Sequence, residues 1–159
     1  LTNKYYDGIV PKASDLQTID EDILKKTEKL VELVGYHIEK FEFKKSLKSF
    51  INIARIGNKY LTDTEPWKLI KNDEARVKTI MSISIKLVTI LSIISEPFLP
   101  FSSLQLKNIM NIKNNFSWNF KISKLINEGH KIGPAKHLFS RINDEEIDKV
   151  IMKMKHEKK

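Results

Sequence analysis

The 159-residue sequence contains no cysteine and has only five glycines and five prolines. Without cysteine, a disulfide framework, a zinc site with thiolate ligands and a cysteine nucleophile are all excluded. The absence of disulfides fits a reducing compartment, and we expect a cytoplasmic protein. The scarcity of glycine and proline leaves room for long, uninterrupted helices, because these two residues are the strongest helix breakers.

Long apolar runs and recognisable catalytic motifs are also lacking. The most apolar stretch, residues 80–94, contains Lys86 and four hydroxyl side chains, so it is typical of a buried helix and not of a membrane span. There is no glycine-rich phosphate loop and no Gly-x-Ser-x-Gly motif. His130 and His137 have Pro134 between them and no carboxylate placed to complete a ligand set, so no metal site is predicted. We expect this chain by itself to catalyse nothing.

What the sequence has in excess is positive charge. Its 28 basic residues outnumber its 20 acidic residues, which gives a formal net charge of +8 and favours an anionic partner. Apart from Arg55, Arg76 and Arg141, every basic residue is lysine. Lysine is a flexible point charge that suits a phosphate backbone better than bidentate reading of bases. A lysine-rich solvated surface has the same composition, so charge alone does not decide between the two.

Apolar residues recur at helical spacing through most of the chain, and no series of alternating strands or internal repeat is found. The sequence therefore predicts an all-α fold. The helix that is apolar nearly all round should be the central one, and Asp20 is expected to be the N-cap of the first long helix. The expected helices run from Asp20 to Phe41, from after Glu42 to Leu61, from about Glu74 to Ser95, from about Ser102 to Met110 and from Asp144 onward, with an Asn-rich loop at Lys113–Phe120 that carries Trp118.

The segment from Asn58 to Trp67 is the most informative one. Pro66 suits the first position of a helix, because its φ is already helical and its missing N–H would be unpaired there. Trp67 should then lie in the first helical turn, where it could stack a base or fill a gap in the core. Asn58 falls on or beside the apolar stripe, so its amide is expected to be paired inside the bundle or directed at a ligand.

Asn58-Lys59-Tyr60 followed by Pro66-Trp67 resembles the Asn-x-Tyr…Pro-Trp signature of the anticodon-binding domain of methionyl-tRNA synthetases. The resemblance covers nearly the whole chain, and the Gly-His-Lys-Ile segment near its end favours this family over related class I synthetases. The other matching segments are Tyr5–Gly8 at the close of the family's first anticodon-domain helix, Pro97–Pro100 at its helix break, and Gly129–Ile132 and Leu138–Ile142 in its last segment.

The resemblance implies an anticodon-binding helical bundle in residues 1–128, with a truncated first helix, and a segment 129–159 that returns toward a catalytic domain. It implies that Trp67 packs against the anticodon, that Pro66 belongs to the same site, and that Asn58 shapes this surface or touches the loop. The family's other readers, an Asn and an Arg one turn apart, would precede Asn3. Since the sequence begins with Leu1 and not with methionine, we expect a fragment of a longer protein.

By resemblance, the parent protein is a methionine–tRNA ligase that activates methionine with ATP and transfers it to tRNA. The family's His-Ile-Gly-His-like and Lys-Met-Ser-Lys-Ser-like motifs are not in this chain. No cofactor is therefore expected here, while ATP and methionine would bind the catalytic domain. The expected partners are methionine tRNA, through its anticodon loop, and that catalytic domain. Two alternatives stay open: the bundle of another class I synthetase, such as the valine or isoleucine enzyme, or a protein-interaction bundle without RNA binding.

Overall fold

A computed structural model describes residues 1–112, 125–140 and 142–156. Within these ranges the only β contact is an isolated bridge between Ile9 and Lys131, so the predicted all-α class is confirmed. The predicted loop with Trp118 lies outside the described residues. The helices are α1 (Thr2–Tyr5), α2 (Thr18–Glu39), α3 (Phe43–Thr64), α4 (Pro66–Leu69), α5 (Glu74–Ile94), α6 (Pro100–Ile109) and α7 (Asp144–His156).

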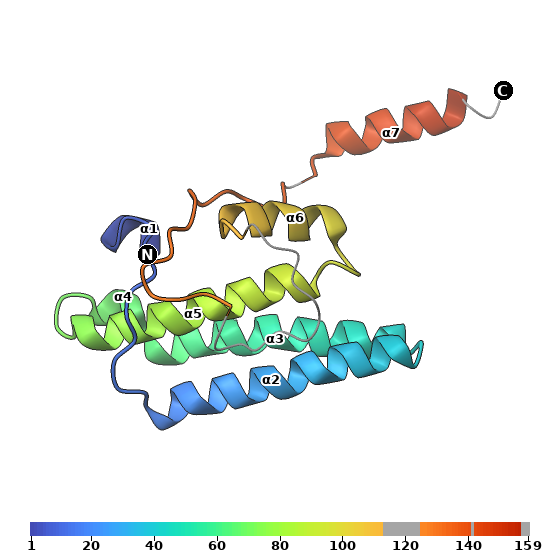
Figure 1. Ribbon diagram of the computed structural model, residues 1–159. Coiled ribbons are helices and arrows are strands. Elements are labelled where there is room, and N and C mark those ends of the chain that lie inside the picture. The colour runs from blue at the N-terminus through green and yellow to red at the C-terminus, as the bar shows by residue number, and fades with distance from the viewer. Residues whose placement is uncertain (113–124, 141, 157–159) are drawn as a thin grey trace.

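Three long helices form the body of the bundle. Figure 1 shows α2 and α3 as an antiparallel hairpin with α5 alongside and α6 lying over α5. The core joins all three, because Ile53 of α3 and Ile90 and Ile94 of α5 are fully buried in one cluster, against which Leu30 of α2 packs. A second cluster contains Ile23 of α2 and Tyr60 of α3. The helices therefore pack as one hydrophobic unit.

The central position predicted for the apolar helix is confirmed for α5, most of whose residues are buried. By length and composition α5 could also cross a membrane, but 72% of that stretch is buried inside the bundle, as in a core helix. Several of its buried hydroxyls bond within the helix, since Ser84 donates to the Ile80 carbonyl at 2.7 Å and Thr89 to the Ile85 carbonyl at 2.9 Å. This local bonding allows a helix with several polar side chains to lie in an apolar core.

The expected N-cap of α2 was wrong, and α6 begins two residues earlier than expected. The N-cap of α2 is Gln17, and Asp20 is the third helical residue, whose Oδ2 accepts a hydrogen bond from the Gln17 N–H at 2.9 Å. An acidic residue can serve either position, and only the backbone decides which one it takes. Helix α6 begins at Pro100 and not at Ser102, because proline is tolerated at the first helical position.

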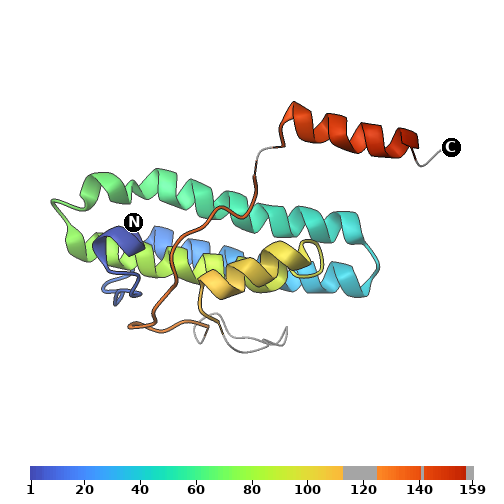
Figure 2. The same cartoon turned by 90° about the horizontal axis from the view of Figure 1, so that it is seen from above.

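The segment after residue 129 is tied to the N-terminal segment and to the end of α6. The Val10 N–H donates to the His130 carbonyl at 2.9 Å, and the Ile132 N–H donates to the Gly8 carbonyl at 2.8 Å. The Gly133 N–H donates to the Ile109 carbonyl at 2.7 Å. Beyond this anchor the chain leads to α7, which lies apart from the bundle in Figure 2 and exposes apolar residues such as Val150 and Met152.

Substitution of Gly8 by alanine should destabilise this anchor. Gly8 has φ +75°, and an added Cβ would lie 2.9 Å from the Ile132 carbonyl oxygen, which is backbone and cannot move freely. Gly129 is the matched control, because its φ is +80° but an added Cβ would meet nothing within 4 Å. Urea unfolding should show a loss of about 1–2 kcal/mol for Gly129→Ala, from the left-handed backbone alone, and a larger loss for Gly8→Ala. Equal losses would contradict the contact argument.

Candidate nucleic-acid interface

The turn between α3 and α4 determines where Trp67 lies. In the last turns of α3, two threonine hydroxyls bond to backbone carbonyls of the same helix. Thr62 Oγ1 donates to the Asn58 carbonyl at 3.1 Å, and Thr64 Oγ1 donates to the Tyr60 carbonyl at 2.7 Å. Glu65 then takes a left-handed conformation with φ 41°, which ends α3. Pro66 is the first residue of α4, as predicted, so Trp67 lies in the first turn of that helix.

Trp67 is half-exposed, with 49% of its surface accessible. The neighbouring Pro66 is buried, and Leu69 on the other side of the short helix packs against the core cluster that contains Tyr60 and Ile80. This packing fixes α4 on the bundle and leaves the indole at its surface. A tryptophan that only filled a gap in the core would be buried, so the simple core interpretation does not fit this position. An exposed aromatic face is what base stacking requires.

Asn58 is exposed on α3, and its side-chain amide has no hydrogen bond to any residue that the structure describes. Of the two alternatives expected for this amide, pairing inside the bundle is therefore wrong, and direction at a ligand stays a prediction. The reason is the helix register: Asn58 lies on the solvent side of α3 with Arg55 and Thr62, while Ile53 and Tyr60 turn inward. Of the three residues singled out in the sequence, Pro66 is thus buried, and Trp67 and Asn58 are accessible near the same end of the bundle.

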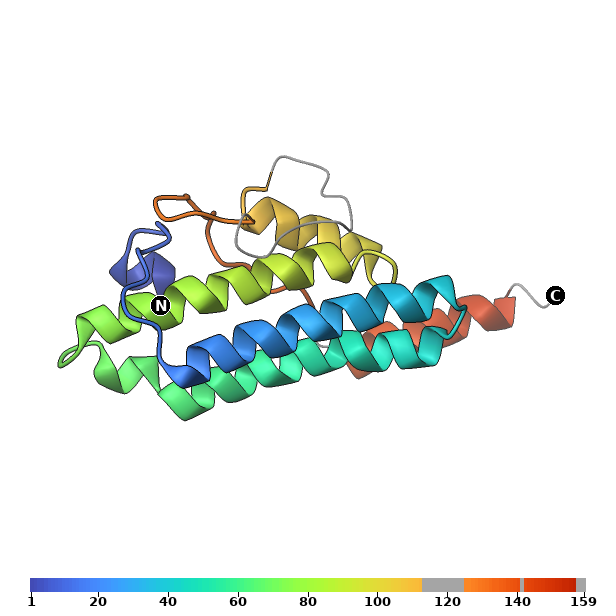
Figure 3. The same ribbon diagram turned by 60° about the horizontal axis from the view of Figure 1, so that its bottom comes forward.

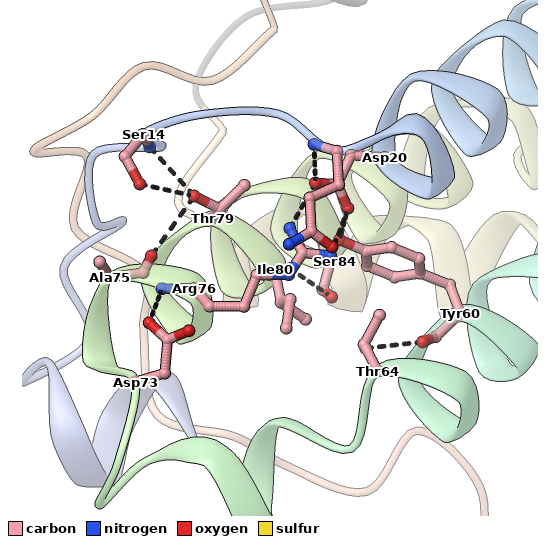
Figure 4. Close-up of polar contacts among 11 residues, drawn as sticks. Ser14, Asp20, Tyr60, Thr64, Asp73, Ala75, Arg76, Thr79, Ile80 and Ser84 are labelled. Carbon is pink, nitrogen blue, oxygen red and sulfur yellow. Dashed lines mark hydrogen bonds and ion pairs between the residues drawn. The ribbon is translucent and has the colours of Figure 1, made fainter.

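A buried polar network that the sequence did not reveal lies behind this surface (Figure 4). The Asp20 carboxylate is fully buried and joins three helices. Tyr60 Oη of α3 donates to Asp20 Oδ1 at 2.6 Å, and Arg76 Nη2 of α5 donates to the same oxygen at 2.9 Å. Arg76 Nη1 donates to Asp20 Oδ2, which also accepts from the Gln17 N–H. Asp20 therefore locks the end of α3 to α2 and α5.

The hydrogen bonds of this network favour the charged forms of Asp20 and Arg76. Burial alone would raise the pKa of the Asp20 carboxyl, but hydrogen bonds from Arg76, Tyr60 and Gln17 outweigh it, and the pKa is lowered. Burial, followed by the hydrogen bond to Asp20, raises the pKa of Tyr60. The hydrogen bond to Asp20 also raises the pKa of Arg76. At neutral pH the site therefore holds an ion pair and a neutral phenol, an arrangement that holds helices together and does not transfer protons.

One signal for this network is present in the sequence. Asp20 precedes Ile23 and Leu24 by three and four residues, which places a carboxylate on the apolar face of α2. An acidic residue on an inward face needs a buried partner. The sequence could not identify that partner, because Arg76 is 56 residues away.

His130 has a structural position. Its Nε2 is 2.7 Å from the Met110 carbonyl oxygen, which fastens the segment after residue 129 to the end of α6. In the part of the chain that the structure describes, no group of three or more His, Asp or Glu side chains is placed to hold a metal ion.

The family model for the anticodon binding domain of methionyl tRNA ligase matches residues 10–159. The chain is 45% identical over 161 residues to the methionine–tRNA ligase of Christiangramia forsetii, covering 97% of this chain and 23% of that protein. It is 42% identical over 156 residues to the corresponding ligase of Flavobacterium psychrophilum, again with 97% and 23% coverage. The chain thus spans about a quarter of the length of the curated relatives it matches.

Solved structures agree in fold. The free state of Mycobacterium tuberculosis methionyl-tRNA synthetase superposes with a TM-score of 0.82 at 22% identity, covering 89% of this chain and 29% of that one. The same enzyme in complex with methionyl-adenylate gives a TM-score of 0.81 at 23% identity, with 88% and 28% coverage. The family match over nearly the whole chain, the ligase relatives and the shared helical bundle lead to one conclusion: this chain belongs to the family of anticodon-binding domains of methionyl-tRNA ligases.

Proposed function

We propose that this domain recognises the anticodon loop of methionine tRNA as part of a methionine–tRNA ligase. The observation that carries the proposal is the half-exposed indole of Trp67, held at the end of the bundle by a buried proline. Bases in a tRNA loop are accessible for stacking, and proteins read RNA mostly at such single-stranded positions. Stacking of one base on an aromatic side chain contributes roughly 1–3 kcal/mol.

Asn58 and Pro66 have different roles in this proposal. The exposed Asn58 amide has both a hydrogen-bond donor and a hydrogen-bond acceptor, so it can bond to a base edge or to a ribose hydroxyl. Pro66 contributes rigidity, because its fixed φ and its burial set the direction in which α4 leaves α3. Lys71, exposed just after α4, adds positive charge close in sequence to Trp67.

The rest of the ligase completes the proposed activity. We propose that a catalytic domain outside this chain uses ATP and methionine, in the cytoplasm, to form methionyl-tRNA. Residues 129–159 would form the segment that returns toward that domain. The exposed apolar residues of α7 support this division, because an amphipathic helix without a packing partner in the described structure presents an apolar face to bind against.

The proposal predicts anticodon-dependent binding. In gel-shift titrations, the full-length ligase that carries this chain should bind a methionine tRNA transcript roughly 5- to 150-fold more tightly than the same transcript with an altered anticodon, because a pair of hydrogen bonds to a base edge discriminates against the wrong base by about 1–3 kcal/mol. Titration with valine and isoleucine tRNA transcripts tests the alternative that this bundle belongs to a related synthetase, which would bind one of them more tightly than methionine tRNA. Equal affinity for all these transcripts would contradict anticodon reading. A bundle that only binds proteins would show no salt-dependent association with tRNA.

A further inference from the structure

The two helices of the α2–α3 hairpin differ in the sign of their charge. Helix α3 carries five cationic side chains and one carboxylate, whereas α2 carries three lysines and six carboxylates, five of them exposed and the sixth, Asp20, buried against Arg76. The helices lie side by side, as Figure 3 shows from the face where both are in front. The exposed surface of α3 is therefore net basic and that of α2 is net acidic, although the two helices form a single packed unit. The cations of α3 are Lys44, Lys45, Lys48, Arg55 and Lys59.

The exposed cations of α3 lie on one line. Lys44, Lys48, Arg55 and Lys59, here called the α3 stripe, are all exposed and recur at intervals of four or seven residues, so they share one face of the helix. At 1.5 Å per residue, the α3 stripe extends over roughly 22 Å. It runs toward the end of α3 from which α4 and Trp67 follow (Figure 1). Asn58 lies beside its last member.

Most cations of the α3 stripe make no ion pair among the described residues. In the described ranges, Lys44, Lys48 and Arg55 take part in none of the ion pairs. Lys59 pairs with Asp63 at 3.0 Å, but the lysine is largely exposed, and such a surface pair contributes little. By contrast, Arg76 is committed to the buried Asp20. Three cations on one face are thus available for an external anion.

We propose that the α3 stripe binds the phosphate backbone of the double-stranded stem that carries the anticodon loop. This proposal rests on the proposed function, because a loop base stacked on Trp67 places the adjoining stem next to the bundle. Proteins bind A-form stems mainly through phosphates and 2′-hydroxyls, and lysine suits phosphate as a point charge. The net negative charge of the exposed side chains of α2 would repel the same backbone. The stem therefore lies along α3 and not along α2.

The test compares two triple variants of the full-length ligase that carries this chain. The first is Lys44→Gln, Lys48→Gln and Arg55→Gln on α3, and the matched control is Lys25→Gln, Lys26→Gln and Lys29→Gln on α2. Both remove three positive charges from an exposed helix face, and glutamine has nearly the helix propensity of lysine and arginine. The Kd for a methionine tRNA transcript is measured over a series of salt concentrations, and far-UV circular dichroism checks that both variants fold.

The slope of log affinity against log salt should become shallower by about two to three for the α3 variant and stay unchanged for the α2 variant. Affinity should fall by the same factor for the cognate and the altered anticodon, because phosphate contacts carry no sequence information. Equal slopes for the two variants, with anticodon discrimination intact, would overturn the α3 stripe and leave the proposed function standing; a stripe that binds an acidic protein surface would give that result. If the unaltered ligase binds the cognate and the altered anticodon equally, both proposals are overturned.

Discussion

Replacing Arg76 by methionine is expected to lower the free energy of unfolding by about 3–5 kcal/mol. The substitution removes both guanidinium hydrogen bonds from Asp20, whose carboxylate has no access to solvent. Tyr60 Oη and the Gln17 N–H would remain as its donors, but neither carries a charge. A buried, uncompensated carboxylate is among the most costly defects in a protein interior.

The measurement is urea unfolding followed by far-UV circular dichroism at neutral pH. Arg55→Met is the matched control, because it removes the same side chain from an exposed position on α3, and its effect should stay within about 0.5 kcal/mol. A loss of similar size in both variants would show that Arg76 acts only through general packing or charge.

A second variant separates the charge from the loss of packing. When Asp20→Asn is combined with Arg76→Met, no buried charge remains. The amide oxygen can still accept from the Gln17 N–H, and the amide NH2, at the position of Oδ1, can donate to Tyr60 Oη. The double variant should therefore be more stable than Arg76→Met alone. If it is less stable, the cost of Arg76→Met does not come from an unpaired Asp20 carboxylate.

The substitution Trp67→Ala should weaken binding of methionine tRNA by roughly 5- to 150-fold, which corresponds to the loss of one stacked base. Discrimination between the cognate and an altered anticodon should fall with it, because a base that is no longer held against the indole is no longer presented for reading. Since half of the Trp67 surface is already in solvent, the free energy of unfolding should fall by only about 1 kcal/mol or less. Gel-shift titration and urea unfolding of the same preparation measure both quantities.

Two controls make the Trp67 experiment specific. Trp67→Phe keeps an aromatic face and should retain much of the affinity. Phe101→Ala removes a more exposed aromatic side chain, 83% accessible on α6, which belongs to no proposed contact, and should leave tRNA binding unchanged. If Trp67→Ala binds both anticodons as the unaltered ligase does, Trp67 is a structural residue and the site assignment is wrong.

The local features of this fold are readable from the sequence because they depend on neighbours in the chain. Helical spacing of apolar residues predicted the α2–α3 pair and the central α5, whose ends lie within about two or three residues of the expected positions. The fixed φ of Pro66 predicted the start of α4, and the order of motifs along the chain predicted the family. Each of these depends on residues a few positions apart or on their order.

Exposure and pairing were decided only by the tertiary structure. Asp20 reads as an N-cap from its neighbours, yet packing brings it against Tyr60 and Arg76, which are 40 and 56 residues away. From its neighbours Trp67 could lie in the core or at the surface, and in the fold Leu69 packs against the core cluster while Trp67 is half-exposed. Asn58 lies on or beside the apolar stripe in the sequence, but in the fold it is exposed. The hydrophobic period determines that a helix has a buried face, but which side chains at its margins are covered depends on the helices that pack against it.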